Sequence, residues 1–366
     1  MRKRVIVAMS GGVDSSVSAY LLKRRGFEVM GITMCFGFTV DNEGGKRPLC
    51  CGLEGIEDAK RVCQKLGIRH YVLDFSRIFE EKIIKDFLEE YLKGRTPNPC
   101  IRCNQFIKFG FLLDKIKEFD AHYLATGHYA RIVRGRKYLL KKAKDKKRDQ
   151  SYFLYRLTQE QLKQIIFPLG GYTKEKVRRI AKSIGLPVAD KLASQEICFI
   201  PDNDYRKFLR QRLAQTNTQI NREIKPGNIL DKEGNILGEH KGICFYTIGQ
   251  REGLNIKNKR GPFYVIRIDA ENNEIIVGKR EDTKFSGLIA KEVNFITGEF
   301  PQKPIFLKAR IRYGHKESDA EVIPLEDKKV KVIFKEPQFA VSPGQSVVFY
   351  KKDIVLGGGI IEESLN

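Results

Sequence analysis

Three cysteine residues carry the side chains best suited to sulfur or metal chemistry. Cys100 and Cys103 form a Cys-x-x-Cys pair, and Cys198 stands much further along the chain. The apolar run before Ser10 is too short for a secretory signal, so we expect the eight cysteines to occupy a reducing compartment. In such a compartment, close cysteine pairs bind metals or do redox chemistry more often than they form structural disulfides. The trio therefore predicts a reactive or metal-binding site.

A second chemical signature is the segment Ser10-Gly11-Gly12-Val13-Asp14-Ser15-Ser16, which follows a strand-like run and opens a helical pattern. Glycines let backbone N–H groups approach oxyanions, hydroxyls add donors, and the helix N-terminus attracts phosphate. The segment lacks both the Gly-Lys-Ser/Thr ending of a P-loop and the three-glycine spacing of a dinucleotide site. We expect it to hold a pyrophosphate group, with Asp14 contacting Mg2+ or capping the helix.

The elements that must position this loop form an alternating pattern over about the first 130 residues. The expected strands are Arg4 to Met9, Val29 to Cys35, His70 to Leu73 and Tyr123 to Thr126. The expected helices, with apolar residues three and four apart, are Val17 to Arg25, Ile56 to Leu66, Ile78 to Lys93 and Phe106 to Phe119. Such alternation predicts a doubly wound α/β domain with a parallel sheet.

The remaining chain changes from helical to β-rich texture. We expect helices from Thr158 to Ile184 and from Tyr205 to Leu213, separated by an extended segment from Leu192 to Pro201. Short strands follow from about Ile224, with a hairpin turn at Asp231 to Asn235. Between Ile305 and Tyr313, apolar residues alternate with mainly basic ones, which predicts a β-barrel with a cationic wall. Three units are expected: an α/β domain (1–205), a small central β-rich domain (206–280) and a C-terminal β-barrel (281–366).

The charge balance favours a polyanionic partner. Lys and Arg total 67 against 45 Asp and Glu, a net charge of +22, and phosphates attract such a surface. The densest run, Lys141 to Arg148, either attracts nucleic acid or is a solvated loop. A highly charged solvated surface is also the alternative for the whole chain. No apolar stretch approaches the roughly 18 residues of a membrane span, so we expect a cytoplasmic protein.

The sequence resembles two nested groups of proteins. The segment from Ser10 to Ser16 is similar to that of the PP-loop ATP pyrophosphatases, which adenylate a carbonyl oxygen and release pyrophosphate. The cysteine segments Arg95 to Asn104 and Glu196 to Ile200 resemble those of bacterial tRNA-uridine 2-sulfurtransferases, also called tRNA 2-thiouridylases. Further segments that match this family are Ala125 to Tyr129, Asp149 to Leu154, Gly249 to Leu254, Pro343 to Ser346 and Gly357 to Ile361.

This resemblance implies roles for particular residues. Those implied to contact ATP are Ala8, Met9, Ser10, Gly11, Gly12, Val13, Asp14, Ser15, Met34 and Gly127. The target base is expected near Asn98, Pro99 and Cys100. Those implied to contact tRNA elsewhere, some of them through the barrel, are His128, Arg148, Asp149, Gln150, Arg312, Tyr313 and Gln345.

The resemblance also implies a reaction, in which ATP and Mg2+ activate O2 of the wobble uridine (U34) in tRNAs for Lys, Glu and Gln. Sulfur then attacks C2 and AMP leaves. We expect the sulfur to come from sulfide or from a sulfur-carrier or desulfurase relay, and the enzyme to be a monomer or weak dimer. The alternative is another PP-loop enzyme, such as tRNA lysidine synthetase or an amidating synthetase, which would not need the three cysteines.

Cys100 departs from the family pattern, because an Asp stands there in many members. In those members a persulfide forms on the equivalent of Cys198 and the equivalent of Cys103 releases its sulfur. With Cys100 present, the trio instead suits three ligands of a [4Fe-4S] cluster with one iron open to sulfide. A persulfide relay and a structural zinc site, with Cys50 or Cys51 as a further ligand, are the alternatives. Those two cysteines are otherwise expected in an exposed loop, and the remaining cysteines, Cys35, Cys63 and Cys244, are expected to be packing residues.

Overall fold

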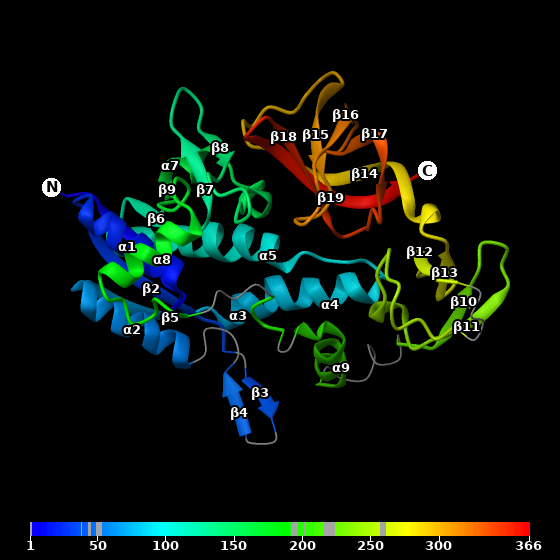
Figure 1. The fold of residues 1–366 in the computed structure, drawn as a ribbon, viewed down its shortest axis with the longest axis horizontal. Coiled ribbons are helices and arrows are strands. Elements are labelled where there is room, and N and C mark those ends of the chain that lie inside the picture. The colour runs from blue at the N-terminus through cyan, green and yellow to red at the C-terminus, as the bar shows by residue number, and fades with distance from the viewer. Residues whose placement is uncertain are drawn as a thin grey trace.

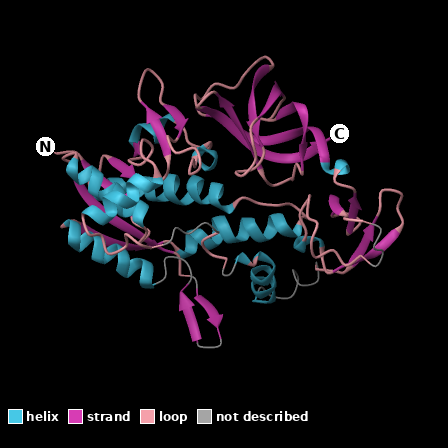
Figure 2. Ribbon diagram, in the orientation of Figure 1, coloured by secondary structure: helices cyan, strands magenta, loops and turns pink. Residues whose placement is uncertain are grey.

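The structure is a computed structural model that describes residues 2–37, 39–42, 45–48, 53–191, 197–200, 203–215, 224–256 and 261–366. Figure 1 shows an N-terminal α/β part, a barrel beside it and a small sheet at the far end. Helices gather around the N-terminal sheet, whereas strands dominate the C-terminal half (Figure 2).

The N-terminal sheet has five parallel strands in the order β5-β2-β1-β6-β9. They are β1 (Arg4–Ala8), β2 (Glu28–Cys35), β5 (Arg69–Asp74), β6 (Tyr123–Ala125) and β9 (Ile165–Ile166). The chain moves one way from β1 to β2 and β5 and the other way to β6 and β9, so the order reverses between β1 and β6. Doubly wound sheets bind ligands at the carboxyl ends of the strands beside such a reversal. The predicted α/β fold is confirmed.

Alternate residues of β1 contribute to two separate cores. Val5 and Val7 pack in the core formed with helices α1 (Val13–Arg24), α2 (Leu53–Leu66) and α8 (Lys174–Ser183). Ile6 and Ala8 belong to the core on the opposite face. Because both faces of the strand are buried, its sequence is a continuous apolar run with no polar alternation.

Two long helices that contain π-helical turns cover this second face. The first consists of α3 (Ser76–Phe79), η1 (Glu80–Ile84) and α4 (Lys85–Leu92). The second consists of α5 (Pro99–Arg102), η2 (Cys103–Phe111), α6 (Leu112–Lys115) and η3 (Ile116–Phe119). The apolar pattern predicts a start at Phe106, whereas the helix begins at Pro99, where Asn98 caps it and proline occupies the first turn. The earlier start puts Cys100 and Cys103 on the helix.

The single helix expected from Thr158 to Ile184 is wrong. Helix α7 (Gln159–Gln164) ends where Ile165 and Ile166 join the parallel sheet as β9, and α8 starts afresh after Thr173. The Thr173 side chain accepts a hydrogen bond from the N–H of Lys176 (3.3 Å) and so caps α8. Of the segment expected to be extended from Leu192 to Pro201, residues 192–196 and 201 lie outside the described residues, and 197–200 form a turn. Helix α9 (Tyr205–Gln215) confirms the last predicted helix.

The central sheet has the strand order β11-β10-β13-β12. The strands are β10 (Gly227–Leu230), β11 (Ile236–His240), β12 (Tyr264–Asp269) and β13 (Glu274–Gly278), with short helices η7 (Ile243–Phe245) and η8 (Glu281–Thr283) beside them. Asp231 accepts hydrogen bonds from the N–H groups of Glu233 and Asn235 (3.1 and 2.7 Å), which fixes the predicted hairpin turn. A separate hairpin pairs β3 (Thr39–Asn42) with β4 (Gly45–Pro48).

The C-terminal strands close into a six-stranded barrel. They are β14 (Lys284–Phe295), β15 (Ile305–Arg310), β16 (Ser318–Pro324), β17 (Val330–Phe339), β18 (Ser346–Lys351) and β19 (Ile354–Leu365). Closure follows because β14 pairs with both β17 and β19. At Gly357 a Cβ atom would lie 2.1 Å from the Asn294 carbonyl oxygen, so the glycine permits this close strand approach.

The cationic wall expected on the barrel is wrong. Lys308 forms an ion pair with Asp319 and Arg310 with Glu317, each at 2.9 Å, so neighbouring carboxylates neutralise this face of β15. Arg312 turns inward instead, and its guanidinium donates to the carbonyl oxygen of Ile248 (3.3 Å). Strand alternation predicted the orientation of the lysine and arginine side chains but not the acidic partners on the next strand.

A hairpin from the N-terminal part joins the barrel sheet. Strands β7 (Ala130–Val133) and β8 (Leu139–Lys142) pair with each other, and β8 pairs with β19. Beyond the hairpin, the buried Tyr152 hydroxyl donates a hydrogen bond to the carbonyl oxygen of Ser346 (2.8 Å). The β7–β8 hairpin therefore belongs to the barrel sheet and approaches the barrel in Figure 1, whereas the five-stranded parallel sheet is separate.

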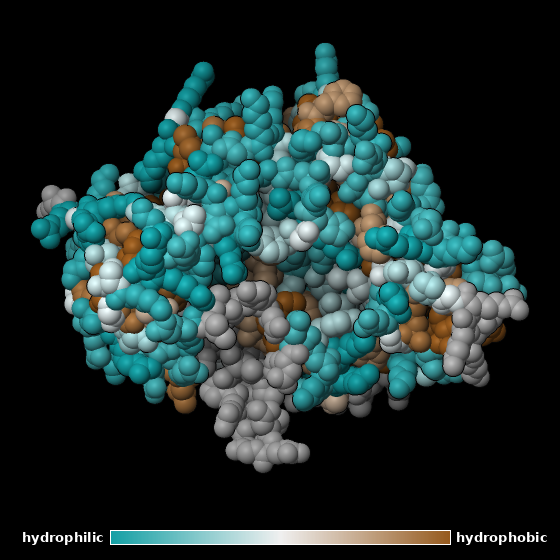
Figure 3. Space-filling model, in the orientation of Figure 1, coloured by the Kyte–Doolittle hydropathy of each residue, from teal (hydrophilic) through white to brown (hydrophobic). Residues whose placement is uncertain are grey.

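The exterior is mainly hydrophilic on the face shown in Figure 3, with apolar atoms confined to small areas. Within the described ranges, no helix is both long and apolar enough to cross a lipid bilayer.

We predict that Tyr152→Phe lowers the free energy of unfolding by about 1 to 2 kcal/mol, because it leaves a buried carbonyl without its donor. Urea unfolding would measure the change. Tyr313→Phe serves as the control, since its side chain is 40% exposed and should change stability by much less. Equal stability of both variants would show that the Tyr152 hydrogen bond does not hold the barrel to the α/β part.

Candidate active site

The loop at residues 10–16 lies at the carboxyl end of β1, beside the reversal in strand order. Gly12 is the N-cap of α1, and the Ser15 and Ser16 hydroxyls both donate back to its carbonyl oxygen (3.1 and 2.8 Å). Gly11 has φ +70°, and a Cβ atom there would lie 2.4 Å from the Gly55 carbonyl oxygen at the start of α2. The loop is therefore compact, with its N–H groups at the positive end of a helix, an arrangement that suits pyrophosphate.

The residues predicted to contact ATP lie close together here, although the side chains of several of them are buried and only their backbone could face a ligand. At Gly127, which follows β6, a Cβ atom would lie 2.9 Å from the Ser15 nitrogen, so the two loops touch. The side chains of Ala8, Met9, Val13 and Met34 are buried in the two cores. Ser10, Gly12 and Asp14 keep exposed surface.

Asp14 has two partners that sequence reasoning missed. The Lys174 ammonium lies 2.7 Å from both carboxylate oxygens, and the Tyr129 hydroxyl donates to Oδ1 (2.8 Å). Burial, followed by the nearby Asp14 charge, raises the pKa of Tyr129, which keeps this hydroxyl protonated. Lys174 is itself buried on the first turn of α8. Such burial is unusual for lysine, but it cannot be read from the sequence, so no local signal marked this residue.

His128 follows Gly127 and sits between the nucleotide loop and the cysteine helix. Its Nδ1 is 2.7 Å from the Thr126 hydroxyl, and its ring packs beside Phe109 and Phe167. Burial, with a smaller contribution from the Lys108 charge, holds the pKa of His128 well below its usual value. The imidazole is therefore neutral at pH 7, so it can position a substrate by hydrogen bonding but is not a cation.

The first turns of α5 and η2 present the cysteine pair. The Asn98 side chain accepts the N–H of Ile101 (3.3 Å), so its oxygen serves as the helix cap. Cys103 is buried against the core, whereas Cys100 is half-buried. Burial and the neighbouring Cys198 thiol raise the pKa of Cys100 to about 11, while Lys108 opposes this shift.

The position of Cys198 is fixed by the residue that follows it, Phe199. Phe199 is 1% exposed and packs among the rings of Phe79, Phe87 and Phe208. With Phe199 anchored in this way, Cys198 stays exposed, and its charge contributes to raising the pKa of Cys100. The structure thus brings together residues that lie far apart in the sequence.

The described residues, which include all three cysteines, contain no group of three His, Cys, Asp or Glu side chains arranged to hold one metal ion. The donor chemistry suits an iron–sulfur cluster, but this arrangement does not gather the thiols around one. Cys50 and Cys51, considered as zinc ligands, lie outside the described residues. Cys63 and Cys244 are buried, as expected of packing residues, and Cys35 is half-buried.

The residues predicted to contact tRNA divide into accessible and structural groups. Asp149 is buried and accepts the N–H of Ala143 (2.9 Å), and Gln150 accepts the N–H of Tyr129 (3.0 Å), so both side chains hold the loop. Arg148 is half-buried, and its N–H donates to the carbonyl oxygen of Asp145 (3.1 Å) in the same loop. Tyr313 is 40% exposed and packs against Phe153 in a tilted arrangement, with ring centroids 4.6 Å apart.

Two other residues predicted to contact tRNA also make contacts within the protein. Gln345 donates to the carbonyl oxygens of Thr96 and Pro97 (3.0 and 3.2 Å), just before the cysteine helix. Arg312 donates to Ile248 and Ser342, and burial lowers its pKa. Pro99 is buried. These side chains therefore stabilise the site through contacts within the protein.

A doubly wound sheet with this glycine-serine loop at the reversal defines a nucleotide-binding domain of the PP-loop class, which uses ATP with Mg2+. Residues 3–202 match the family model described as the tRNA methyl transferase HUP domain. Residues 207–279 match the tRNA methyl transferase PRC-barrel domain, and 285–361 the aminomethyltransferase beta-barrel domain.

Relatives with similarity along the whole chain carry a more specific name. The tRNA-specific 2-thiouridylase MnmA 1 of Caldanaerobacter subterraneus is 55% identical, over 100% of this chain and 99% of that protein. The tRNA-specific 2-thiouridylases MnmA of Acetivibrio thermocellus and Clostridium acetobutylicum are 52% and 48% identical, each over 99% of this chain and at least 99% of their own. The chain belongs to the tRNA-specific 2-thiouridylase family. This confirms the resemblance drawn from the motifs and disfavours lysidine synthesis or amidation.

We predict that Lys174→Gln weakens ATP binding by about tenfold, because it removes a buried cation beside the pyrophosphate loop. Asp14→Asn should also impair ATP use, and both variants should keep wild-type affinity for tRNA. Isothermal titration with ATP and filter binding of tRNA would measure these effects. Lys182→Gln is the matched control, because Lys182 lies on the same helix and pairs with Asp190 on the surface. Wild-type ATP affinity in Lys174→Gln would contradict a nucleotide site at this loop.

Proposed function

We propose that this protein uses ATP and Mg2+ to convert U34 in tRNAs for Lys, Glu and Gln into 2-thiouridine. The observation that carries the proposal is a short link between the two chemical sites. The His128 ring packs against Phe109 on the helix that carries Cys103, with ring centroids 5.9 Å apart, and His128 directly follows Gly127, which touches the nucleotide loop. A base activated by ATP would therefore lie within reach of the cysteines.

The reaction begins when O2 of the uracil attacks the α-phosphorus of ATP and pyrophosphate leaves. The N–H groups at the start of α1 bind the pyrophosphate, and Lys174 adds a positive charge beside it. The adenylated oxygen is a good leaving group, so a sulfur nucleophile attacks C2 and AMP departs with the former O2. Neutral His128 can accept or donate one hydrogen bond to orient the base.

Sulfur reaches the base through the cysteine trio by one of two routes. In the persulfide route, an external sulfur donor leaves a persulfide on Cys198, and the Cys103 thiolate attacks its inner sulfur. Hydrosulfide is released for attack on C2, and the resulting Cys103–Cys198 disulfide is reduced by an external dithiol. In the second route, Cys100, Cys103 and Cys198 would hold a [4Fe-4S] cluster, which would supply sulfide. The three thiolates are suitable donors, although their arrangement among the described residues does not gather them around one cluster.

Transfer RNA would reach this site along the loop from Ala143 to Gln150. Lys144, Lys146 and Lys147 are exposed, whereas Lys141 and Lys142 pair with Asp353 and Glu317. The loop contacts the start of α8, where Asp145 accepts the N–H of Lys174 (3.0 Å). It therefore carries unneutralised lysines from the nucleotide loop toward Tyr313 on the barrel, whose exposed ring suits stacking with an unpaired base.

Changing Lys144, Lys146 and Lys147 together to Ala should weaken tRNA binding and reduce the slope of log affinity against log salt by about 2, because fewer counterions are released. Fluorescence anisotropy at several salt concentrations would measure the slope. A control with three exposed lysines elsewhere, Lys117, Lys163 and Lys303, should have a smaller effect. An unchanged slope in the loop variant would identify this run as a solvated loop.

The two sulfur routes predict different behaviour for Cys100→Ser. If the cluster route operates, the variant loses the visible absorption, the iron and the acid-labile sulfide of anaerobically purified protein, together with thiolation. If the persulfide route operates, Cys103→Ser and Cys198→Ser abolish thiolation, whereas Cys100→Ser only slows it. Iron and sulfide analysis together with mass spectrometry of tRNA nucleosides would decide, and Cys35→Ser is the control. Full thiolation by all three variants would contradict a role for the trio.

A further inference from the structure

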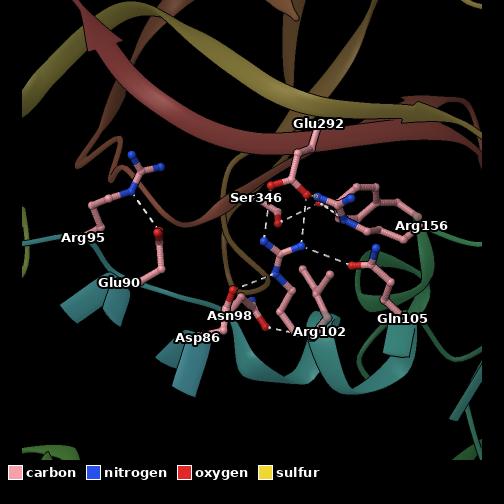
Figure 4. Close-up of polar contacts among 11 residues, drawn as sticks. Asp86, Glu90, Arg95, Asn98, Arg102, Gln105, Arg156, Glu292 and Ser346 are labelled. Carbon is pink, nitrogen blue, oxygen red and sulfur yellow. Dashed lines mark hydrogen bonds and ion pairs between the residues drawn. The ribbon is translucent and has the colours of Figure 1, made fainter. Parts of the chain in front are cut away.

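Arg102, one of the two residues between the active-site cysteines, points away from them. Successive residues on a helix are turned by about 100°, so Arg102 projects about 130° around the helix axis from the midpoint of Cys100 and Cys103. Its side chain reaches the barrel, as Figure 4 shows. Arg102 is only 15% exposed although it is charged. A contact made by this guanidinium therefore holds the turn that carries both thiols, from the side that faces away from them.

Arg102 is held by three acceptors from three elements. Its Nη1 and Nη2 lie 3.1 and 3.4 Å from the two carboxylate oxygens of Glu292 on β14. Its Nε is 3.5 Å from Asp86 on α4, and Nη1 also donates to Gln105 one turn along (3.3 Å). Figure 4 shows the guanidinium in the middle of these groups. A planar guanidinium bound on two edges has little freedom to rotate, so the turn is fixed in orientation.

Glu292 bridges two arginines. Its Oε2 also accepts from Arg156 (3.0 Å), whose side chain is 9% exposed. Burial alone would raise the pKa of Glu292, but the hydrogen bond and charge of Arg102 and the charge of Arg156 lower it below its usual value. Burial, with the charges of Glu90 and Glu292, raises the pKa of Asp86. Glu292 is therefore the firmly ionised member, and removing its charge would leave two half-buried arginines facing each other.

The backbone conformation at Glu292 directs its carboxylate toward Arg102. Its φ is +49°, a left-handed conformation that costs energy for a residue with a Cβ atom. The pairing of β14 with β19 shifts register between Lys291 and Asn294, and such bulges redirect side chains. The strained backbone conformation therefore lies at the barrel residue whose carboxylate binds Arg102.

A second contact ties the barrel to the segment that leads into this helix. The Thr96 N–H donates to the carbonyl oxygen of Pro343 (2.8 Å), and the Gln345 side chain binds the carbonyl groups of Thr96 and Pro97. At Gly344 a Cβ atom would lie 2.9 Å from Thr96. The barrel therefore holds the chain both before the helix and on its back.

We propose that Glu292 is a positioning residue for sulfur transfer, through which the barrel sets the orientation of the turn carrying Cys100 and Cys103 by way of Arg102. This inference rests on the proposed function for its catalytic consequence. The structural part, that the Glu292 carboxylate controls the accessibility of the two thiols, stands independently of the reaction.

The test compares Glu292→Gln with Asp319→Asn, a matched control that removes a barrel carboxylate whose partner is Lys308 and not the cysteine helix. Glu292→Gln should lower the single-turnover rate of thiolation by about tenfold, since a small misplacement of reacting groups has effects of this size. The Kd for tRNA and the rate of ATP-dependent pyrophosphate release should stay within about twofold of wild type, because neither the RNA surface nor the nucleotide loop is touched. Asp319→Asn should match wild type in all three.

A second measurement does not depend on catalysis. Reduced, full-length protein is treated with iodoacetamide, and alkylation of Cys100 and Cys103 is followed by peptide mass spectrometry. Glu292→Gln should change the ratio of the two alkylation rates at least about threefold, because the turn is no longer fixed, whereas Asp319→Asn should leave it unchanged. Should Glu292→Gln fail to fold, Arg102→Lys tests the same link, since lysine keeps the charge but loses the planar fork.

Wild-type thiolation and alkylation in Glu292→Gln would overturn the proposal. Loss of tRNA affinity that accounts for the whole drop in rate would overturn it as well, because Glu292 would then act through RNA binding. If wild-type protein does not thiolate tRNA at all, the proposed function fails, while the alkylation ratio still decides whether Glu292 sets the cysteine turn.

Discussion

The turn that carries Cys100 and Cys103 is held by two parts of the chain at once, and the chemistry of the site depends on that double support. From the α/β side, Ile101 is buried in the core and the Asn104 side chain donates to the carbonyl oxygen of Phe153 (3.2 Å). From the other side, the barrel binds Arg102. Transfer of a single atom requires reacting groups to meet within a fraction of an ångström, so a helix end free to fray would be a poor place for it.

The nucleotide loop depends on a different constraint, which is the close approach of backbones at the reversal in the sheet. Gly11 lies against the start of α2, and Gly127 lies against the start of α1. Neither contact leaves room for a side chain. The N–H groups at the helix start are therefore presented by packing of the surrounding backbone, and Lys174 from a third helix neutralises Asp14 beside them. This site is assembled from elements that are distant in sequence but adjacent in the sheet.

The sequence allowed much of this architecture to be predicted, because buried parallel strands and amphipathic helices leave strong periodic signals. The strands around Val5, Ile32 and Leu124 and the loop from Ser10 to Ser16 were found in this way. Family motifs gave the cysteine trio, of which Cys100 and Cys103 lie on the first turns of one helix. The expected long helix after Thr158 failed because Ile165 and Ile166 fit a helical period equally well, and only the neighbouring β6 makes them a strand.

Other features could not be predicted because they depend on pairing across the fold. Periodicity places Lys308 and Arg310 on one face of a strand, but only the register of β15 with β16 reveals the carboxylates opposite them. Arg102 and Glu292 are separated by 190 positions, and nothing local indicates that they meet. Lys174 likewise reads as an ordinary first-turn lysine until α8 is placed against α1.

The pairing of β8 with β19 has a consequence for how the enzyme is divided into parts. A catalytic unit separated from the barrel would expose the backbone N–H and C=O groups of β8 along a new sheet edge, and such edges promote association with other chains. The barrel alone would in turn lose the hairpin that covers β19. The α/β part and the barrel are therefore expected to fold together. A hinge motion between them would have to move the β7–β8 hairpin together with β19.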